Sequence, residues 1–132
     1  MTKEELIREA FEALKHSYSP YSHYPVGAAV LLKDGAIIYG ANIENASYPC
    51  GVCAESAALH NAYSQGYRRN DIEALAIVSE GNTVAGPCGI CRQVIHELMN
   101  PDTPIYLANR REWKETTIRE LLPMSFGPED LQ

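Results

Sequence analysis

The sequence predicts an α/β fold, in which helices pack on the faces of a mixed, mostly parallel β-sheet. The first observation is an alternation of helical segments with short apolar strands along most of the chain. The second is a strong hairpin turn, Asp34-Gly35, between the first two strands. Strands joined through a helix are expected to run parallel and hairpin strands antiparallel, so the sheet is mixed. The 132 residues suffice for one domain, 1–132.

The first half of the chain contains one helix and one hairpin before the second helix begins. A capping box formed by Thr2 and Glu5 starts the first helix, which ends near Ser17 because prolines follow. The apolar run 26–32 is predicted as a buried strand, and residues 36–39 return antiparallel to it.

The second half continues the alternation, with Gly or Pro at several boundaries. Its predicted elements are a helix from Ala54 to Gly66, a strand over 72–78, a helix striped by apolar residues from 91 to 99, a strand over 105–108 and a short helix capped by Thr117. The resulting order is α-β-β-α-β-α-β, followed by a small C-terminal appendage.

Composition and charge exclude several classes of function. Hydrophobic residues make up 45% of the chain and charged residues 21%, as in an ordinary soluble domain. The net charge of -6 does not suit a nucleic-acid backbone. The acidic N-terminus does not suit a signal peptide, and no apolar run approaches the ~18 residues of a membrane span. We therefore expect a cytoplasmic protein whose cysteines are reduced and serve metal binding or catalysis.

All four cysteines fall in two Cys-x-x-Cys pairs, Cys50 with Cys53 and Cys88 with Cys91. Paired cysteines at this spacing indicate a zinc site. Four ligands would make a closed structural site, whereas three ligands would leave an open position for water in a hydrolytic enzyme. Glu55 favours three ligands, because at helical spacing it lies over the turn that presents Cys53 without ligating the metal. The segment Cys53-Ala-Glu55 followed by Pro87-Cys88-Gly-Ile-Cys91 is the cysteine form of the zinc deaminase signature.

Further motifs extend this pattern in both directions along the chain. In order, the motifs are Tyr24-Pro-Val-Gly-Ala-Ala29, Asn42-Ile-Glu-Asn45, Cys53-Ala-Glu55, Pro87-Cys-Gly-Ile-Cys-Arg-Gln93, and Leu121-Leu-Pro with Phe126-Gly-Pro-Glu-Asp-Leu131. With them, nearly the whole chain resembles the small zinc-dependent cytidine deaminases of pyrimidine salvage. The resemblance implies a three-layer α/β/α fold with a sheet of about five strands. It also implies one Zn²⁺ per subunit and a homotetramer with sites at subunit interfaces.

The resemblance assigns roles to individual residues. It implies that Cys53, Cys88 and Cys91 bind zinc and that Glu55 is the proton shuttle. The implied substrate-binding residues are Asn42 and Glu44 at the ribose 3′-hydroxyl, Ala54 and Gly86 through their backbones, Tyr24 beside the substrate in place of the usual Phe, and Tyr48 and Phe126 from a neighbouring subunit.

The reaction implied is hydrolytic deamination of cytidine and deoxycytidine to uridine and deoxyuridine, with release of ammonia. Zinc would activate a water, and Glu55 would carry protons to N3 and then to the leaving amine. Ser56 is a departure from the family, because many relatives with three cysteines carry there an Arg that offsets the thiolate charge. The helix dipoles behind Cys53 and Cys88, or Arg92, would then have to provide this compensation.

Two alternatives fit parts of the sequence. A deaminase of another aminopyrimidine nucleoside, such as blasticidin S, shares the zinc motifs but has no obvious use for Asn42 and Glu44. A structural zinc module that binds a partner protein would make Cys50 a fourth ligand and leave Glu55 idle. The small-molecule substrate is accordingly expected to be a nucleoside, with no nucleic-acid or membrane partner.

Overall fold

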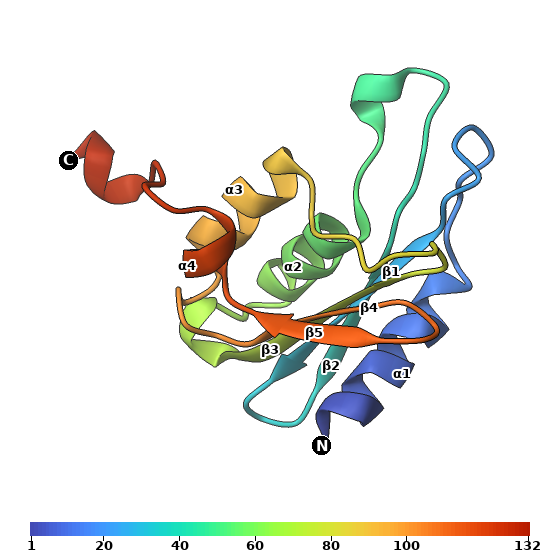
Figure 1. Cartoon of the computed structure of the whole chain (residues 1–132). Helices are drawn as coiled ribbons and strands as arrows, with labels where there is room; N and C mark the ends of the chain where they lie inside the picture. The colour runs from blue at the N-terminus through green and yellow to red at the C-terminus, as the bar shows by residue number, and fades with distance from the viewer.

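The computed structural model describes residues 1–132, which form a five-stranded sheet between two layers of helices (Figure 1). In chain order, the elements are α1 (Lys3–Leu14), β1 (Val26–Leu32), β2 (Ile37–Ala41), the 3₁₀ turn η1 (Tyr48–Cys50), α2 (Ala54–Ser64), η2 (Arg69–Asp71), β3 (Ile72–Ser79), α3 (Gly89–Leu98), β4 (Ile105–Ala108), β5 (Trp113–Thr116), α4 (Ile118–Leu121) and η3 (Pro128–Leu131). None of the helices has the length and apolar character needed to cross a bilayer.

The sheet has the strand order β2-β1-β3-β4-β5. The predicted mixed sheet is confirmed, and β2, β3 and β4 all run in the same direction. The expectation of a mostly parallel sheet is nevertheless wrong for neighbouring strands, because only β3 and β4 pair in parallel. The reason is topological: β1 enters the sheet between β2 and β3 and is antiparallel to both.

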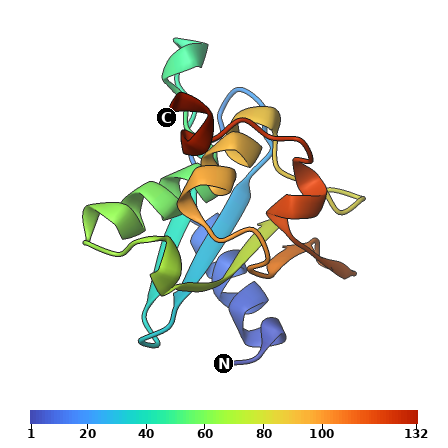
Figure 2. The ribbon, with the colours of Figure 1, turned by 90° about the vertical axis from the view of Figure 1, so that its left-hand side faces the viewer.

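The helices divide between the two faces of the sheet, which confirms the three layers (Figure 2). α1 covers one face, where Leu6, Ala10 and Leu14 pack on β1, β3 and β4. α2, α3 and α4 cover the other face around a larger apolar cluster that includes Leu59 and Ile95. Because β1 contributes Ala28 and Val30 to one cluster and Ala29 and Leu31 to the other, its side chains alternate between the layers as a central strand requires.

Two local details differ from the sequence prediction. The hairpin turn spans three residues, 33–35, because the Leu32 N–H bonds the Ala36 carbonyl and Gly35 takes φ +93. A type I turn closed by a left-handed glycine is the usual three-residue solution, so the two-residue turn was wrong. The sequence also did not reveal β5, a short edge strand whose four residues are largely exposed.

Two glycines set the distance between the sheet and its helices. A Cβ at Gly27 would lie 2.2 Å from the Ala10 carbonyl oxygen, so α1 packs directly on the backbone of β1. A Cβ at Gly40 would lie 2.3 Å from the Ala54 carbonyl oxygen and 2.5 Å from the Ala58 nitrogen. The start of α2 therefore rests on the end of β2, which places the residues that begin α2 beside those that follow β2.

Candidate metal centre and its cavity

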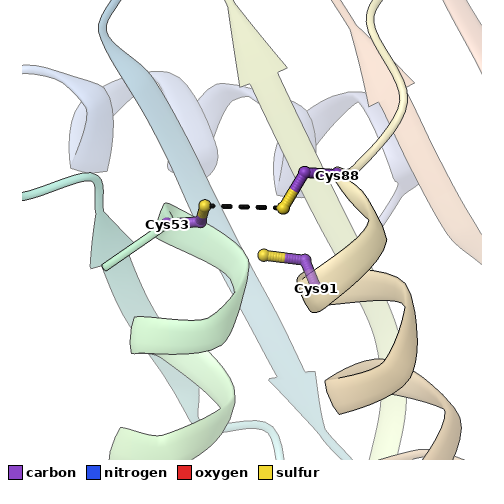
Figure 3. A group of neighbouring side chains, drawn as sticks. All are labelled: Cys53, Cys88 and Cys91. Atoms are coloured by element: carbon purple, nitrogen blue, oxygen red, sulfur yellow. Dashed lines mark hydrogen bonds between the residues drawn. The ribbon is translucent and has the colours of Figure 1, made fainter. Parts of the chain in front are cut away.

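Three thiols meet where α2 and α3 begin (Figure 3). Cys53 is the N-cap of α2, Cys88 is the N-cap of α3, and Cys91 lies in the first turn of α3. Their sulfurs turn toward one another between the two helix ends. Unpaired backbone N–H groups and the positive end of the dipole favour thiolates at such positions.

The sulfur positions fit zinc. A tetrahedral zinc with bonds of about 2.3 Å holds its sulfur ligands roughly 3.8 Å apart. The Sγ atoms of Cys53 and Cys88 are 3.8 Å apart, and the three sulfurs all lie within 4.8 Å of one another. The exposed thiol of Cys50 is not part of this group, so the geometry does not support a closed site of four cysteines.

Cys91 is the most enclosed of the three thiols, with an exposed fraction of 0%. It donates a hydrogen bond to Glu55 Oε1 at 3.3 Å, and its sulfur lies 3.1 Å from the hydroxyl oxygen of Ser56. Glu55 and Ser56 are themselves buried, at 4% and 5% exposed. The site therefore places one buried carboxyl and one buried hydroxyl directly against the sulfur cluster.

The pKa values of the cluster respond to these contacts. The pKa of Cys53 is lowered to about 7, chiefly by its hydrogen bond with the Cys91 thiol. The pKa of Cys91 is raised, first by the same hydrogen bond and then by burial and the charge of Glu55. Burial also raises the pKa of Glu55. A buried carboxyl whose pKa is raised takes up a proton more readily than a free one, as a group that alternates between base and acid requires.

Arg92 does not reach the sulfurs. Its Nε donates to the Pro87 carbonyl and its Nη1 to the Leu121 carbonyl, each at 2.8 Å. The sequence suggested that either Arg92 or the two helix dipoles offset the thiolate charge. The structure places the two helix starts at the cluster, together with the neutral hydroxyl of Ser56.

A cavity of about 450 Å³ opens beside the thiols. Besides Cys53 and Cys88, it brings together six of the residues that the sequence indicated, from four different parts of the chain. They are Tyr24, Asn42, Glu44, Ala54, Glu55 and Gly86. Ala54 is the first residue of α2, so its N–H has no partner within the helix and is free to donate to a bound molecule.

Asn42 and Glu44 are held by the loop that precedes β1. The Asn42 side chain accepts from the Val26 N–H and the Ser17 hydroxyl and donates to the Tyr24 carbonyl. Its amide retains one N–H to donate. The Glu44 carboxylate accepts from the N–H groups of Tyr21 and Ser22 at 3.0 Å each, and from the Ser22 hydroxyl.

The hydrogen bonds from Ser22 are the largest cause of a lowered pKa at Glu44, so this carboxylate stays ionised and retains acceptor capacity. Together, Asn42 and Glu44 offer one donor and one acceptor at the same edge of the cavity. A hydroxyl group of a ligand would use both.

Tyr48 and Phe126 do not line this cavity. Tyr48 lies in η1 and borders a neighbouring groove of about 550 Å³, and its side chain is 76% exposed. Phe126 is 57% exposed on the C-terminal segment. Both segments project beyond the layers at the end of the molecule opposite the N-terminus (Figure 1).

Two further residues of the cavity were not found from the sequence. Ser22 holds Glu44, and Ser79 ends β3 in the cavity wall. Neither carries a motif. The loop before β1 has to fold back on residues 42–44, as the isolated bridge between Tyr18 and Ile43 shows, before Ser22 can reach Glu44.

Comparisons with known proteins agree with this geometry. The family model for the "Cytidine and deoxycytidylate deaminase zinc-binding region" matches residues 1–107. A cytidine deaminase of Halalkalibacterium halodurans is 49% identical over 132 residues, with 99% of this chain and 98% of the relative covered. A cytidine deaminase of Sporosarcina psychrophila is 46% identical over 99% of this chain and 96% of its own length.

Solved structures extend the likeness to three dimensions. The crystal structure of a cytidine deaminase from Burkholderia pseudomallei superposes with a TM-score of 0.93 at 42% identity, covering 96% of this chain and 100% of the other. A Mycobacterium tuberculosis cytidine deaminase carrying one substitution gives a TM-score of 0.84 at 35% identity, with 98% of each chain covered. Residues 1–107, which the model of the zinc-binding region matches, include Cys53, Cys88 and Cys91 at the two helix starts.

Proposed function

Because the chain belongs to the zinc-dependent cytidine and deoxycytidylate deaminase family and is a hydrolytic enzyme of that family, we propose that it deaminates free cytidine and deoxycytidine. The products would be uridine or deoxyuridine and ammonia. The observation that carries the proposal is Glu55, a buried carboxyl in contact with the thiol cluster at the wall of a nucleoside-sized cavity. Asn42 and Glu44 at the edge of the cavity offer a sugar hydroxyl both the donor and the acceptor that it needs.

The chemistry divides among named groups. Zinc, held by Cys53, Cys88 and Cys91, supplies when bound a Lewis acid that makes a water more acidic. Glu55 would take one proton of the attacking water and deliver it to N3 of the cytosine, while the oxygen of that water bonds C4. Glu55 would then carry the second proton of the same water to the amine, which leaves as ammonia when its bond to C4 breaks. The free N–H of Ala54 donates to the pyrimidine edge, and the carbonyl of Gly86 accepts from the departing ammonia. Burial of Glu55 serves both halves of this cycle, because its raised pKa makes the protonated form accessible.

The proposal includes a homotetramer in which Tyr48 and Phe126 complete the site of a neighbouring subunit. Its support is that both aromatic side chains are largely exposed on projecting segments and neither lines the cavity of its own chain. A free nucleoside as substrate would give the enzyme a role in pyrimidine salvage. We place it in the cytoplasm, where the thiols that bind zinc stay reduced.

The test is the ultraviolet absorbance of cytidine and deoxycytidine, followed in the presence of protein of known zinc content. We expect both nucleosides to be deaminated. Glu55→Gln should retain zinc and lose about 10²–10⁴-fold in kcat, because it keeps the size of the side chain and removes its proton transfer. Zinc-loaded protein that converts neither nucleoside would refute the proposed reaction, and blasticidin S in the same assay tests the other aminopyrimidine substrate.

A further inference from the structure

The side chain of Tyr24 reaches across one end of the cavity to the end of β3. Its hydroxyl donates a hydrogen bond to Ser79 Oγ at 3.2 Å, which joins two residues 55 positions apart in the sequence. Tyr24 is 40% exposed, whereas Ser79 is buried at 4%. Both residues line the cavity that contains Glu55. The bond therefore ties a wall of the cavity to the central sheet.

The hydroxyl end of the Tyr24 ring lies against the backbone of Gly81. A Cβ at Gly81 would lie 3.0 Å from the Tyr24 hydroxyl oxygen and 3.4 Å from its Cε2. The Gly81 carbonyl accepts a hydrogen bond from Asn109 Nδ2 at 3.2 Å. Asn109 is itself buried, and its Oδ1 accepts from the N–H groups of Arg111 and Glu112. The phenol of Tyr24 thus contacts Ser79, which ends β3, and Gly81, which is hydrogen-bonded to Asn109, the residue after β4.

The backbone of Tyr24 is held by Asn42, which is proposed to bind the sugar, and by Ser22, which contacts Glu44. The Tyr24 carbonyl accepts from Asn42 Nδ2 at 2.9 Å, and the Tyr24 N–H donates to the Ser22 hydroxyl at 3.1 Å. The same Ser22 hydroxyl donates to Glu44. The ring is consequently held at both ends, with Asn42 and Glu44 on one side and Ser79 on the other.

We propose that the hydrogen bond between Tyr24 and Ser79 positions the Tyr24 ring as a wall of the nucleoside site and thereby sets substrate affinity, with Ser79 as the positioning residue. The inference rests on the proposed nucleoside function. Neither hydroxyl is hydrogen-bonded to Glu55 or to a thiol of the metal cluster. A ring already held in one orientation loses no further freedom when a nucleoside packs against it, which favours binding without changing the chemical step.

The experiment measures KM, kcat and zinc content for Tyr24→Phe, Ser79→Ala and the double variant with cytidine. Each single change should raise KM about two- to tenfold, the range expected for one neutral hydrogen bond, and leave kcat and zinc content unchanged. The double variant should be no worse than the poorer single variant, because both changes remove the same bond. Unchanged KM values in the single variants, or effects that add in the double variant, would overturn the inference.

Two further variants separate position from the hydroxyl itself. Gly81→Ala keeps both hydroxyls but places a methyl group 3.0 Å from the phenol oxygen, so it should also raise KM. Tyr39→Phe is the matched control, because its hydroxyl bonds Glu9 at 3.2 Å outside the cavity, and its KM should equal that of the wild type. Wild-type protein that fails to deaminate cytidine refutes the proposed function; an active wild type with unaltered Tyr24 and Ser79 variants refutes only the positioning role.

Discussion

The metal cluster and the projecting segments differ in how completely one chain builds them. The cluster lies on the ends of two packed helices, and Cys91, Glu55 and Ser56 are all buried there within a single chain. The projecting segments carry Tyr48 and Phe126, which remain largely exposed. A single chain therefore brings together the groups proposed for the proton and metal chemistry, whereas the proposed enclosure of the nucleoside depends on what the exposed aromatic residues contact.

The cluster should respond most strongly to the loss of one of its three thiols. Cys91→Ala should abolish zinc binding and activity, because it removes one of three ligands and opens a cavity beside Glu55. Cys50→Ala is the matched control, since it removes an exposed thiol outside the cluster and should change neither. Zinc content by atomic absorption, together with turnover of cytidine, tests both. Loss of zinc in Cys50→Ala would instead restore a site with four ligands.

An intermediate effect tests the projecting segments. Phe126→Ala should raise KM for cytidine about tenfold while zinc content stays stoichiometric, because the apolar contact proposed between Phe126 and the substrate would be lost and the cluster is untouched. Mixing this variant with Glu55→Gln is informative, since a shared site would let one subunit supply the aromatic ring and another the carboxyl. If the mixed oligomers are more active than the two variants measured separately and added, Phe126 contributes to the site of a neighbouring subunit. If activity does not recover and light scattering shows a monomer, that contribution is excluded.

The hydroxyl of Ser56 should have a smaller influence, on how firmly the thiolates hold the metal. Ser56→Ala should accelerate zinc release to a chelator a few-fold, because the Cys91 sulfur loses its one neutral hydroxyl partner at 3.1 Å. Loss of an outer partner of a metal ligand commonly weakens metal affinity by about 10–100-fold, and a weak O–H···S contact belongs at or below the lower end of that range. Ser64→Ala, at the exposed end of α2, is the control. Equal release rates for all three proteins would leave Ser56 without a role at the metal.

The sequence predicted those parts of the fold and site that depend on local pattern. The N-cap at Thr2, the apolar run of β1 and the cysteine spacing at each helix start all act within a few residues, and each is present in the structure. Only this half of the predicted capping box forms, because the Glu5 carboxylate accepts from the Thr2 hydroxyl and not from the Thr2 backbone N–H. Features that depend on long-range packing were missed. β5 shows no alternation of apolar residues because it is an exposed edge strand. The antiparallel pairing of β1 with β3 joins two strands that β2 and α2 separate in the sequence, so no local pattern predicts it.

The same distinction applies within the cavity. Asn42, Glu44 and Glu55 stand in recognisable motifs. Ser22 and Ser79 do not, and they contact Glu44 and Tyr24 only because the loop before β1 folds against residues 42–44 and the end of β3. Gly40 gave no signal as a site residue either, although its missing side chain lets the start of α2 approach β2. Close approach of backbones is a property of the packed molecule, and a lone glycine in a strand is ambiguous before packing is known.

The position of the thiols also has a thermodynamic consequence. Cys53 and Cys88 lie 35 residues apart in the sequence, on helices that otherwise meet mainly through apolar side chains. A metal shared between them acts as a reversible cross-link that closes a long loop and binds the folded chain far better than the unfolded one. The melting temperature should therefore rise with the concentration of free zinc, because the ion binds the folded chain and holds the starts of α2 and α3 together. The metal proposed to take part in catalysis would then also stabilise the fold.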